Sequence, residues 1–334
     1  MNTPPHRRLS LFTLRTCQIW LGGLCLGLFV GPPAIAADEK PVWHVRAERL
    51  AENPVIKPGM ANLPGENING PSLIRVPAWI QHPLGKYYLY FADHHGQYIR
   101  MAYADHLPGP WTIYAPGVLQ KSQTVCTTHI ASPDVQVDEA NHEIRLYFHG
   151  QTNGTGQLSF LARSPDGLAF TAGSQPLGPS YFSVFQHRAA WYTVTKQGGS
   201  GRLYRSPDGV TLFGEGPPLI PRMRHSAAKV AGDTLWLFYS RTGDAPESIE
   251  VSRVDLSGNW QDWPTGLGPS QVVLKPEHDY EGANLPLAPS HSGAAQQAEN
   301  ALRDPGIFEE DGRTYLIYSV AGERGLGLAE LFFE

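Results

Sequence analysis

Five short apolar segments, rich in aromatic and β-branched residues, recur along the chain. They are residues 87–91, 144–148, 190–194, 235–239 and 315–318, and each follows a polar or glycine-containing turn. Aromatic and branched residues favour strands, and a turn directly before such a run is typical of a hairpin. Each run is therefore predicted to be the second strand of a hairpin.

The surroundings of these runs repeat as well. Each is preceded by another short apolar segment, and most are followed by a third strand-like segment, such as 99–104 and 248–254. The turn sequence Ser-Pro-Asp-Gly occurs at 164–167 and again at 206–209. The repeating unit is a meander of three or four antiparallel strands, roughly 40 to 50 residues long, and it is present five times.

A repeat of this length in an all-β chain predicts a five-bladed β-propeller. The predicted domain spans 65–334 after an N-terminal extension at 37–64, with blades at about 70–114, 129–171, 179–213, 223–263 and 300–334. A β-sandwich also accommodates short strands, but it requires no repeating unit. No long window has helical periodicity. The polar segment 264–300 is predicted to be a long loop over one face.

The first 36 residues have the pattern of a secretory signal. Arg7, Arg8 and Arg15 supply positive charge around an apolar run at 19–31, and Ala34-Ile35-Ala36 supplies the small residues before a cleavage site. Cleavage after Ala36 predicts a secreted or periplasmic protein. A membrane anchor is the alternative, but spanning a bilayer takes about 20 apolar residues. No stable membrane insertion is expected after cleavage.

The charge of the chain and its cysteine content bear on two questions, whether it binds nucleic acid and whether it forms a disulfide. The chain has 26 Lys and Arg against 31 Asp and Glu and carries no basic run, so nucleic acid is not an expected partner. Of the three cysteines, Cys17 and Cys25 belong to the signal segment. Cys126 then has no internal disulfide partner and is predicted to be buried and inert. No sequence feature indicates an oligomeric state.

Three short motifs make the chain similar to a known protein family. They are Ala131-Ser132-Pro133-Asp134-Val135, Arg303-Asp304-Pro305-Gly306 and Phe91-Ala92-Asp93-His94-His95. With the fivefold repeat, they resemble the five-bladed propeller glycosidases, the broad group around glycoside hydrolase families 43, 32, 62 and 117. The resemblance implies an exported glycoside hydrolase that acts on a polysaccharide or its oligosaccharides, with a carbohydrate substrate as partner.

Glycoside cleavage needs two carboxyl groups on opposite sides of the bond. Asp134 and Asp304 lie at the beginning of strands that line the axial channel, and Glu247 and Glu323 lie on loops after second strands. These four residues are the candidate catalytic groups. Asp134 is the first candidate for the base, and Glu247 or Glu323 for the acid.

One departure from the family opens two alternatives. Family 43 places an Asp at the start of blade one, where this chain has Asn67-Ile68-Asn69-Gly70. The base then comes from another blade, from Asp134 first or Asp304 second, or the protein is a non-catalytic carbohydrate-binding propeller. A lyase that uses His or Tyr as base is a third interpretation.

Polar residues near the predicted strand starts and ends are candidates for sugar binding. Histidine, asparagine and arginine side chains bind hydroxyl groups, and arginine also binds carboxylate or sulfate. The candidate binding residues are Asn69, His94, His95, His129, Arg224, His225 and Arg303. No metal-binding spacing is present and no cofactor is required. The resemblance allows a structural divalent cation on the propeller axis.

Overall fold

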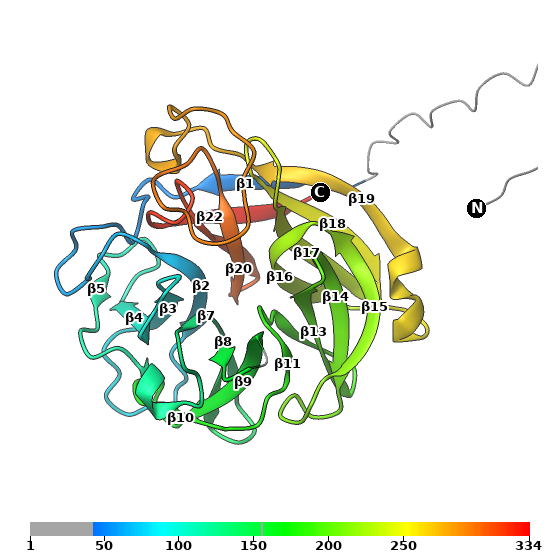
Figure 1. The fold of residues 1–334 in the computed structure, drawn as a ribbon, viewed down its shortest axis with the longest axis horizontal. Coiled ribbons are helices and arrows are strands. Elements are labelled where there is room, and N and C mark those ends of the chain that lie inside the picture. The colour runs from blue at the N-terminus through cyan, green and yellow to red at the C-terminus, as the bar shows by residue number, and fades with distance from the viewer. Residues whose placement is uncertain (1–42, 155) are drawn as a thin grey trace, which may run out of the picture. The chain divides into compact units, whose positions relative to one another are not determined.

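Five antiparallel sheets are arranged around a common axis in a computed structural model that describes residues 43–154 and 156–334 (Figure 1). The predicted fold class, an all-β five-bladed propeller, is confirmed. The predicted signal segment, 1–36, lies outside the described residues. Within the described residues, we find no helix long and apolar enough to cross a membrane.

The first two blades each carry a short additional strand on their outer side. Blade one contains β2 (Asn69–Arg75), β3 (Tyr87–Ala92), β4 (Tyr98–Ala104) and β5 (Thr112–Ile113), with β6 (Leu119–Gln120) also paired to β4. Blade two contains β7 (Ile130–Asp138), β8 (Glu143–Thr152), β9 (Gly156–Ser164) and β10 (Thr171–Ala172), with β11 (Gly178–Pro179) also paired to β9.

The other three blades have four strands each. Blade three contains β12 (Val184–His187), β13 (Ala190–Gln197), β14 (Ser200–Ser206) and β15 (Gly214–Pro221). Blade four contains β16 (Met223–Ala231), β17 (Thr234–Arg241), β18 (Ile249–Asp255) and β19 (Leu267–Leu274). Blade five contains β20 (Arg303–Glu310), β21 (Arg313–Ser319), β22 (Leu326–Phe333) and β1 (Val45–Arg49). Short 3₁₀ helices are η1 (Lys121–Gln123), η2 (Trp260–Gly266) and η3 (Asp279–Glu281).

The fifth blade is completed by a strand from the start of the described chain. β1 pairs antiparallel with β22, from Val45 opposite Phe333 to Arg49 opposite Ala329. The sequence had placed these residues in the extension at 37–64. Instead they cover the outer edge of β22, which would otherwise expose unpaired backbone groups. The two ends of the described chain are therefore joined in one sheet.

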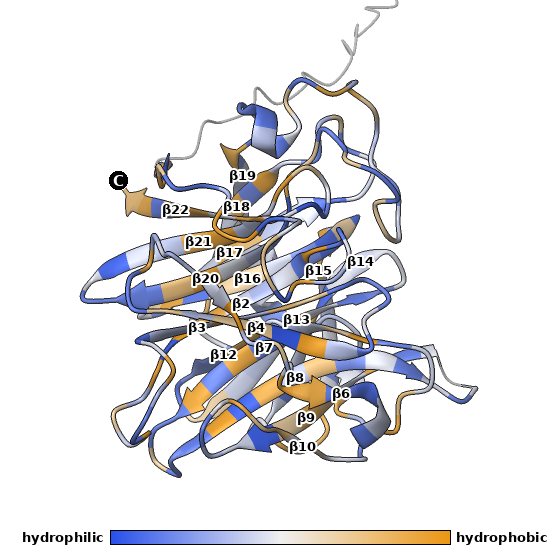
Figure 2. Ribbon diagram, turned by 90° about the vertical axis from the view of Figure 1, so that its left-hand side faces the viewer, coloured by the Kyte–Doolittle hydropathy of each residue, from blue (hydrophilic) through white to orange (hydrophobic). Residues whose placement is uncertain are grey.

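Apolar side chains fill the spaces between neighbouring blades. Leu89 and Phe91 of β3 belong to one buried cluster with Ile317 of β21 and Leu328 of β22, which joins blades one and five. Apolar residues alternate with polar ones along many strands (Figure 2). Cys126 is buried and free, as predicted, and burial raises the pKa of its thiol. The core thus holds the blades in the ring that positions the axial residues.

The inner strands of four blades begin with an irregularity that presents side chains to the axis. Their registers shift between Asn69 and Ser72, between Ala131 and Asp134, between Met223 and Ser226, and between Arg303 and Gly306. Three of these bulges contain a residue with positive φ followed by proline, namely Gly70 (58°), Ser132 (47°) and Asp304 (49°). Non-glycine residues seldom adopt this conformation, and such bulges often redirect side chains at functional sites.

The bulges also fix which residues of different blades correspond. Aligning Pro133 with Pro305 makes Asp304 equivalent to Ser132, and Asp134 equivalent to Gly306. The two aspartates are thus two positions apart along their strands. In blade one, a Cβ on Gly70 would lie 3.0 Å from the Cα of Ser132, so glycine is required by the close approach of blade two.

Candidate active site

A cluster of titratable side chains surrounds a small cavity where the inner strands begin. All five blades contribute to it. The lining residues are Asn69, His94, His129, Ala131, Ser132, His149, Tyr181, Lys196, Arg224, His225, Gly293, Asp304 and Glu323. The cavity has a volume of about 20 Å³, and an adjoining one of about 80 Å³ lies further along the axis. We call the first the upper cavity.

Asp304 and His225 form a buried pair on one side of the upper cavity. Nδ1 of His225 contacts Oδ1 of Asp304, and the hydroxyl of Ser319 donates to Oδ2 of Asp304 over 3.1 Å. Burial alone would raise the pKa of Asp304, but His225, Arg224 and Arg303 together hold this pKa well below its usual value. Asp304 is therefore an ionised carboxylate that orients the His225 ring.

Glu323 and His94 form a second pair across blades five and one. Nδ1 of His94 lies 3.3 Å from Oε1 of Glu323, and the amide of Asn67 donates to Oε2 over 2.5 Å. Burial favours the protonated acid, but the hydrogen bond and charge of His94 and the bond from Asn67 lower the pKa of Glu323 overall. Asn69 takes part by donating to Oδ1 of Asn67 over 2.8 Å.

Glu247 lies beneath the upper cavity and is fully buried. Its carboxylate accepts a hydrogen bond from Nε of Arg224 over 2.7 Å and another from Nε of Arg303 over 2.8 Å. The hydroxyl of Ser240 donates to it over 2.8 Å. Glu247 thus neutralises two buried arginines and holds Arg224 in the cavity wall.

A row of aromatic rings runs along the other side of the upper cavity. Tyr181 lies between His149 and His225, with ring centroids 4.3 Å from each. The His129 ring follows at 6.0 Å from His149, and His95 at 6.5 Å from His129. Burial and then the charge of Asp304 raise the pKa of Tyr181 to about 12, so it keeps its hydroxyl proton at neutral pH.

Lys196 reaches the upper cavity from β13. Its Nζ lies 5.8 Å from the centroid of the Tyr181 ring. Burial and the nearby Arg224 lower its pKa. Lys196 is not among the site residues predicted from the sequence. Lys196 follows the 190–194 run by two positions, as His149 follows the 144–148 run by one. The position of a polar residue just beyond an apolar run is therefore the sequence feature that could have identified Lys196 as a site residue.

The sequence predicted one long loop over 264–300, but residues 267–274 pair with β18 as β19, so only the connection after β19 is a loop. Part of that connection closes the upper cavity. Residues 290–296, which we call the cover segment, bond to the site through their main chain. The guanidinium of Arg224 donates to the carbonyl of His291 and, over 3.4 Å, to that of Gly293. The amide of Ala295 donates to Oε2 of Glu323 over 3.3 Å. Figure 1 shows the loop, in orange, over the fifth blade.

The structure divides the predicted site residues into three groups. Those that line the upper cavity are Asn69, His94, His129, Arg224, His225, Asp304 and Glu323. Glu247 and Arg303 lie behind its wall, and His95 contacts the rings of His94 and His129. Asp134 lies along the adjoining cavity instead, where its Oδ2 accepts from the amide of Val184 over 2.6 Å. Burial raises the pKa of Asp134 to about 6.

The upper cavity is poorly suited to the divalent cation that the resemblance allows. Calcium takes six to eight oxygen ligands. Here Lys196 and Arg224 add positive charge, and the oxygens of Asp304 are already bound by His225 and Ser319. No cluster of three or more His, Cys, Asp or Glu suited to a metal ion occurs among residues 43–154 and 156–334.

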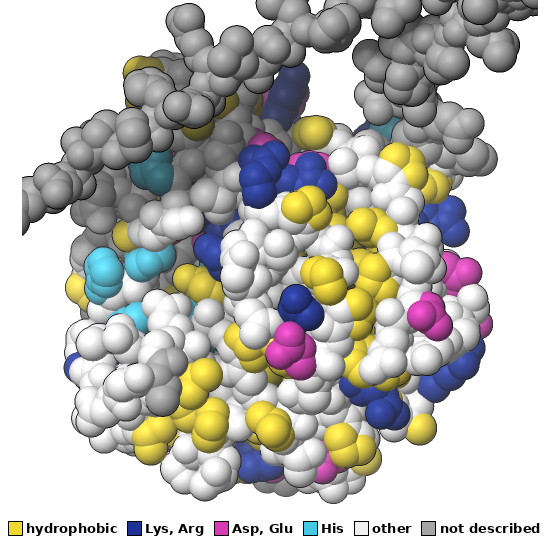
Figure 3. Space-filling view, turned by 45° about the vertical axis from the view of Figure 1, so that its right-hand side comes forward, with side chains coloured by type: hydrophobic (Ala, Val, Ile, Leu, Met, Phe, Trp, Pro, Cys, Tyr) yellow, Lys and Arg dark blue, Asp and Glu magenta, His cyan; other side chains and the backbone are white. Residues whose placement is uncertain are grey.

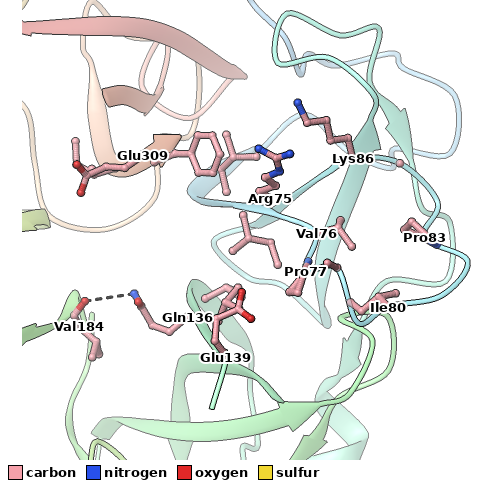
Figure 4. Close-up of a pocket in the computed structure, with 18 of the residues that line it drawn as sticks. Arg75, Val76, Pro77, Ile80, Pro83, Lys86, Gln136, Glu139, Val184 and Glu309 are labelled. Carbon is pink, nitrogen blue, oxygen red and sulfur yellow. Dashed lines mark hydrogen bonds between the residues drawn. The ribbon is translucent and has the colours of Figure 1, made fainter. Parts of the chain in front are cut away.

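The opposite end of the axis opens into a wider cavity of about 1260 Å³ (Figure 4). Its labelled residues include Arg75, Lys86, Glu139 and Glu309 at the rim, with Val76 and Ile80 among the apolar ones. The described residues that line it include no histidine. On the face in Figure 3, acidic and basic side chains are interspersed. Acid and base groups converge at the upper cavity instead.

His149 gives the site a measurable pH dependence of stability. Burial, followed by the charges of His129, His225 and His94, holds its pKa well below the usual value. As the pH falls below about 6.5, His149 gains a proton in the unfolded chain but not in the folded one. The free energy of unfolding therefore decreases by up to about 1.4 kcal/mol per pH unit. We expect His149→Phe to reduce the loss of stability between pH 7.5 and 5.5, measured by urea unfolding. The control is His44→Phe, which changes an exposed histidine. If the free energy of unfolding depends on pH equally in the unmodified protein and in both variants, the prediction is contradicted.

Solved structures similar to this one include glycoside hydrolases. A putative glycoside hydrolase from Parabacteroides distasonis matches with a TM-score of 0.59 at 13% identity, covering 85% of this chain and 95% of that one. An α-L-arabinofuranosidase from Lactobacillus brevis matches with a TM-score of 0.58 at 14% identity, covering 83% and 92%. A family 43 β-xylosidase/α-arabinofuranosidase from a compost microbial metagenome was solved with xylotriose in a calcium-free form. It matches with a TM-score of 0.54 at 14% identity, covering 83% of this chain and 94% of that one.

The chain is thus a five-bladed β-propeller with the architecture of the family 43 glycoside hydrolases. No family model matches its sequence. It is 36% identical over 301 residues to an uncharacterized protein of Acanthamoeba polyphaga mimivirus, an alignment that covers 79% of this chain and 83% of the relative. The chain belongs to the same protein family as that viral protein.

Proposed function

We propose that the protein is a glycoside hydrolase whose reaction takes place at the upper cavity. The observation that carries the proposal is the pairing of two carboxylates with two imidazoles around one axial cavity, Asp304 with His225 and Glu323 with His94. Hydrolysis of a glycoside needs a proton donor for the leaving oxygen and a base or nucleophile on the other side. The shared fold with glycoside hydrolases supports the same reaction class.

The two pairs suit different roles. Asp304, whose low pKa keeps it ionised, would act as base or nucleophile, either itself or through His225. The pair of His94 and Glu323, joined over 3.3 Å, would give a proton to the leaving oxygen. Asp134 would stabilise the contact between β7 and blade three, because it bonds the amide of Val184 rather than lining the upper cavity.

Substrate entry would require movement of the cover segment. A cavity of about 20 Å³ has room for about one water molecule and not for a sugar ring. Displacing residues 290–296 would break the bonds that the Arg224 guanidinium and the Oε2 of Glu323 make to main-chain groups of the loop, while Arg224 stays bonded to Glu247 and Oε2 to Asn67. A sugar that takes over these hydrogen bonds would stabilise the open form.

The direct test is release of product from a panel of aryl glycosides and oligosaccharides. The panel should include β-xylosides and α-L-arabinofuranosides, which the names of the structural neighbours suggest, together with uronides. Cleavage of at least one substrate, abolished by substitutions at Asp304, is the expected result. A sugar that raises the melting temperature while none of the panel is cleaved would refute hydrolysis.

That refuting outcome would favour a carbohydrate-binding protein without turnover. One observation favours this second candidate. Both carboxylates of the upper cavity are already engaged by imidazoles, and their pKa values are lowered rather than raised. A general acid near neutral pH is usually a carboxyl group with a raised pKa.

We further propose that the protein is exported and that residues 1–36 are removed. The basic start, the apolar run at 19–31 and Ala34-Ile35-Ala36 support this proposal. Expression of the whole chain in a bacterium should yield a periplasmic protein whose mass corresponds to a start at Ala37. A cytosolic product that retains Met1 would refute it.

A further inference from the structure

Two buried side-chain nitrogens that line the upper cavity, Nδ1 of His149 in blade two and Nε2 of His225 in blade four, have no hydrogen-bond partner within the described part of the chain. The half-buried Lys196 of blade three lines the same cavity, with its Nζ beside the Tyr181 ring. Buried polar atoms in proteins are nearly always paired, and each exception calls for an explanation. Since all three residues line one cavity, a ligand with several acceptor atoms would satisfy them together.

Charge distinguishes Lys196 from the other residues of the cavity. Arg224 is paired with Glu247 over 2.7 Å, Glu323 with His94 over 3.3 Å, and Asp304 with His225. Lys196, by contrast, has no ion pair with any residue in 43–154 or 156–334. Its half-buried ammonium is offset only by the more distant charges of Glu247 and Asp304, while burial and Arg224 disfavour its charged form.

The position of Lys196 is fixed by its strand. Its amide donates to the carbonyl of Ser180 over 3.3 Å, and it lies opposite Gly201 in β14. The neighbouring Thr195 also bonds the carbonyl of Ser180 through its hydroxyl. These contacts hold the backbone beside Tyr181, so the side chain extends along the ring toward the cavity.

We propose that the sugar bound at the upper cavity is anionic, with a carboxylate or a sulfate ester held by Lys196. His149 and His225 would complete the site by hydrogen bonding to the same sugar. The inference rests on the proposed carbohydrate function and specifies its substrate class. An ammonium paired with an anionic oxygen makes a stronger hydrogen bond than a neutral donor does, so the charge selects for uronic or sulfated sugars over neutral ones.

Calorimetric titration of the purified protein tests the proposal. The probes are D-glucuronate, D-galacturonate and galactose 6-sulfate, with glucose and galactose as neutral counterparts. We expect at least one anionic sugar to bind about tenfold or more tightly than its neutral counterpart, which corresponds to about 1.4 kcal/mol. Comparison of the uronates with the sulfated sugar distinguishes the two anionic groups.

Variants at Lys196 distinguish an effect of its charge on sugar binding from an effect on folding. Lys196→Met should abolish the preference for the anionic sugar, and Lys196→Arg should retain most of it. Lys57→Met makes the same change at an exposed lysine and should leave the preference intact. Equal affinity for neutral and anionic sugars, a preference that persists in a folded Lys196→Met protein, or no binding of any probe would overturn the proposal.

Failure of this proposal differs from failure of the proposed hydrolase function. Preference for an anionic sugar without cleavage of any substrate would refute hydrolysis and leave the inference on Lys196 standing. Cleavage of neutral glycosides in preference to uronides, with a rate ratio unchanged in Lys196→Met, would refute the inference and leave hydrolysis standing.

Discussion

Asp304→Asn is expected to lower kcat for glycoside hydrolysis by about 10²- to 10⁴-fold, the range that a positioned acid or base contributes. The substitution keeps the size of the side chain but removes the charge that the low pKa maintains. It also weakens the contact that orients Nδ1 of His225. Initial rates on the best substrate of the panel, with melting temperature as a check on folding, provide the measurement.

Two further variants make the result specific. Asp311→Asn changes an exposed aspartate in the turn after β20, at a φ of 52° that asparagine adopts well, and should leave kcat unchanged. Asp134→Asn addresses the other aspartate that the sequence selected. If Asp134→Asn eliminates activity while Asp304→Asn retains it, the base lies in the adjoining cavity and the assignment to Asp304 is wrong.

Glu247→Ala is expected to destabilise the protein by about 3–5 kcal/mol, the cost of breaking a buried ion pair and leaving charge without a partner. Arg224 and Arg303 are both nearly fully buried, at 5% and 1% exposed, and both bond to this one carboxylate. Without it, Arg224 loses its ion pair in a dry environment, whereas Arg303 keeps its ion pair with Glu299. Urea unfolding at pH 7 measures the loss.

The matched control is Glu330→Ala, which removes a carboxylate paired with the exposed Arg313. Such surface pairs contribute about 0–1 kcal/mol. Similar losses in both variants would contradict the structural role of Glu247. A stable Glu247→Ala protein with normal turnover would show that the two arginines find other partners.

The fold was predictable because its main determinant is local. Each blade carries an aromatic run after a turn, and five repeats of that pattern define the ring. The closing strand at 45–49 was not predictable in the same way, because its partner is β22 at the far end of the sequence. A single strand without a neighbouring hairpin has no repeat pattern, so the sequence assigned it to an extension.

The candidate site was predictable in composition but less so in geometry. Both Asp134 and Asp304 lie beside a proline, which made them appear equivalent. Asp134 follows its proline whereas Asp304 precedes its own, and the bulge places them two positions apart. Lys196 was missed because its significance depends on which charges lack partners, and only the pairing of Arg224, Glu323 and Asp304 across the blades reveals that.

The pairing of β1 with β22 has a consequence for how the protein is made. β1 leaves the ribosome early in synthesis, but it can pair only after β22 has been made near the end of the chain. Until then, the edge of β1 is available to other chains and the fifth blade is unfinished. We therefore expect synthesis to produce an incomplete ring that depends on chaperones until translation ends, and truncation before residue 326 to give aggregates rather than a smaller propeller.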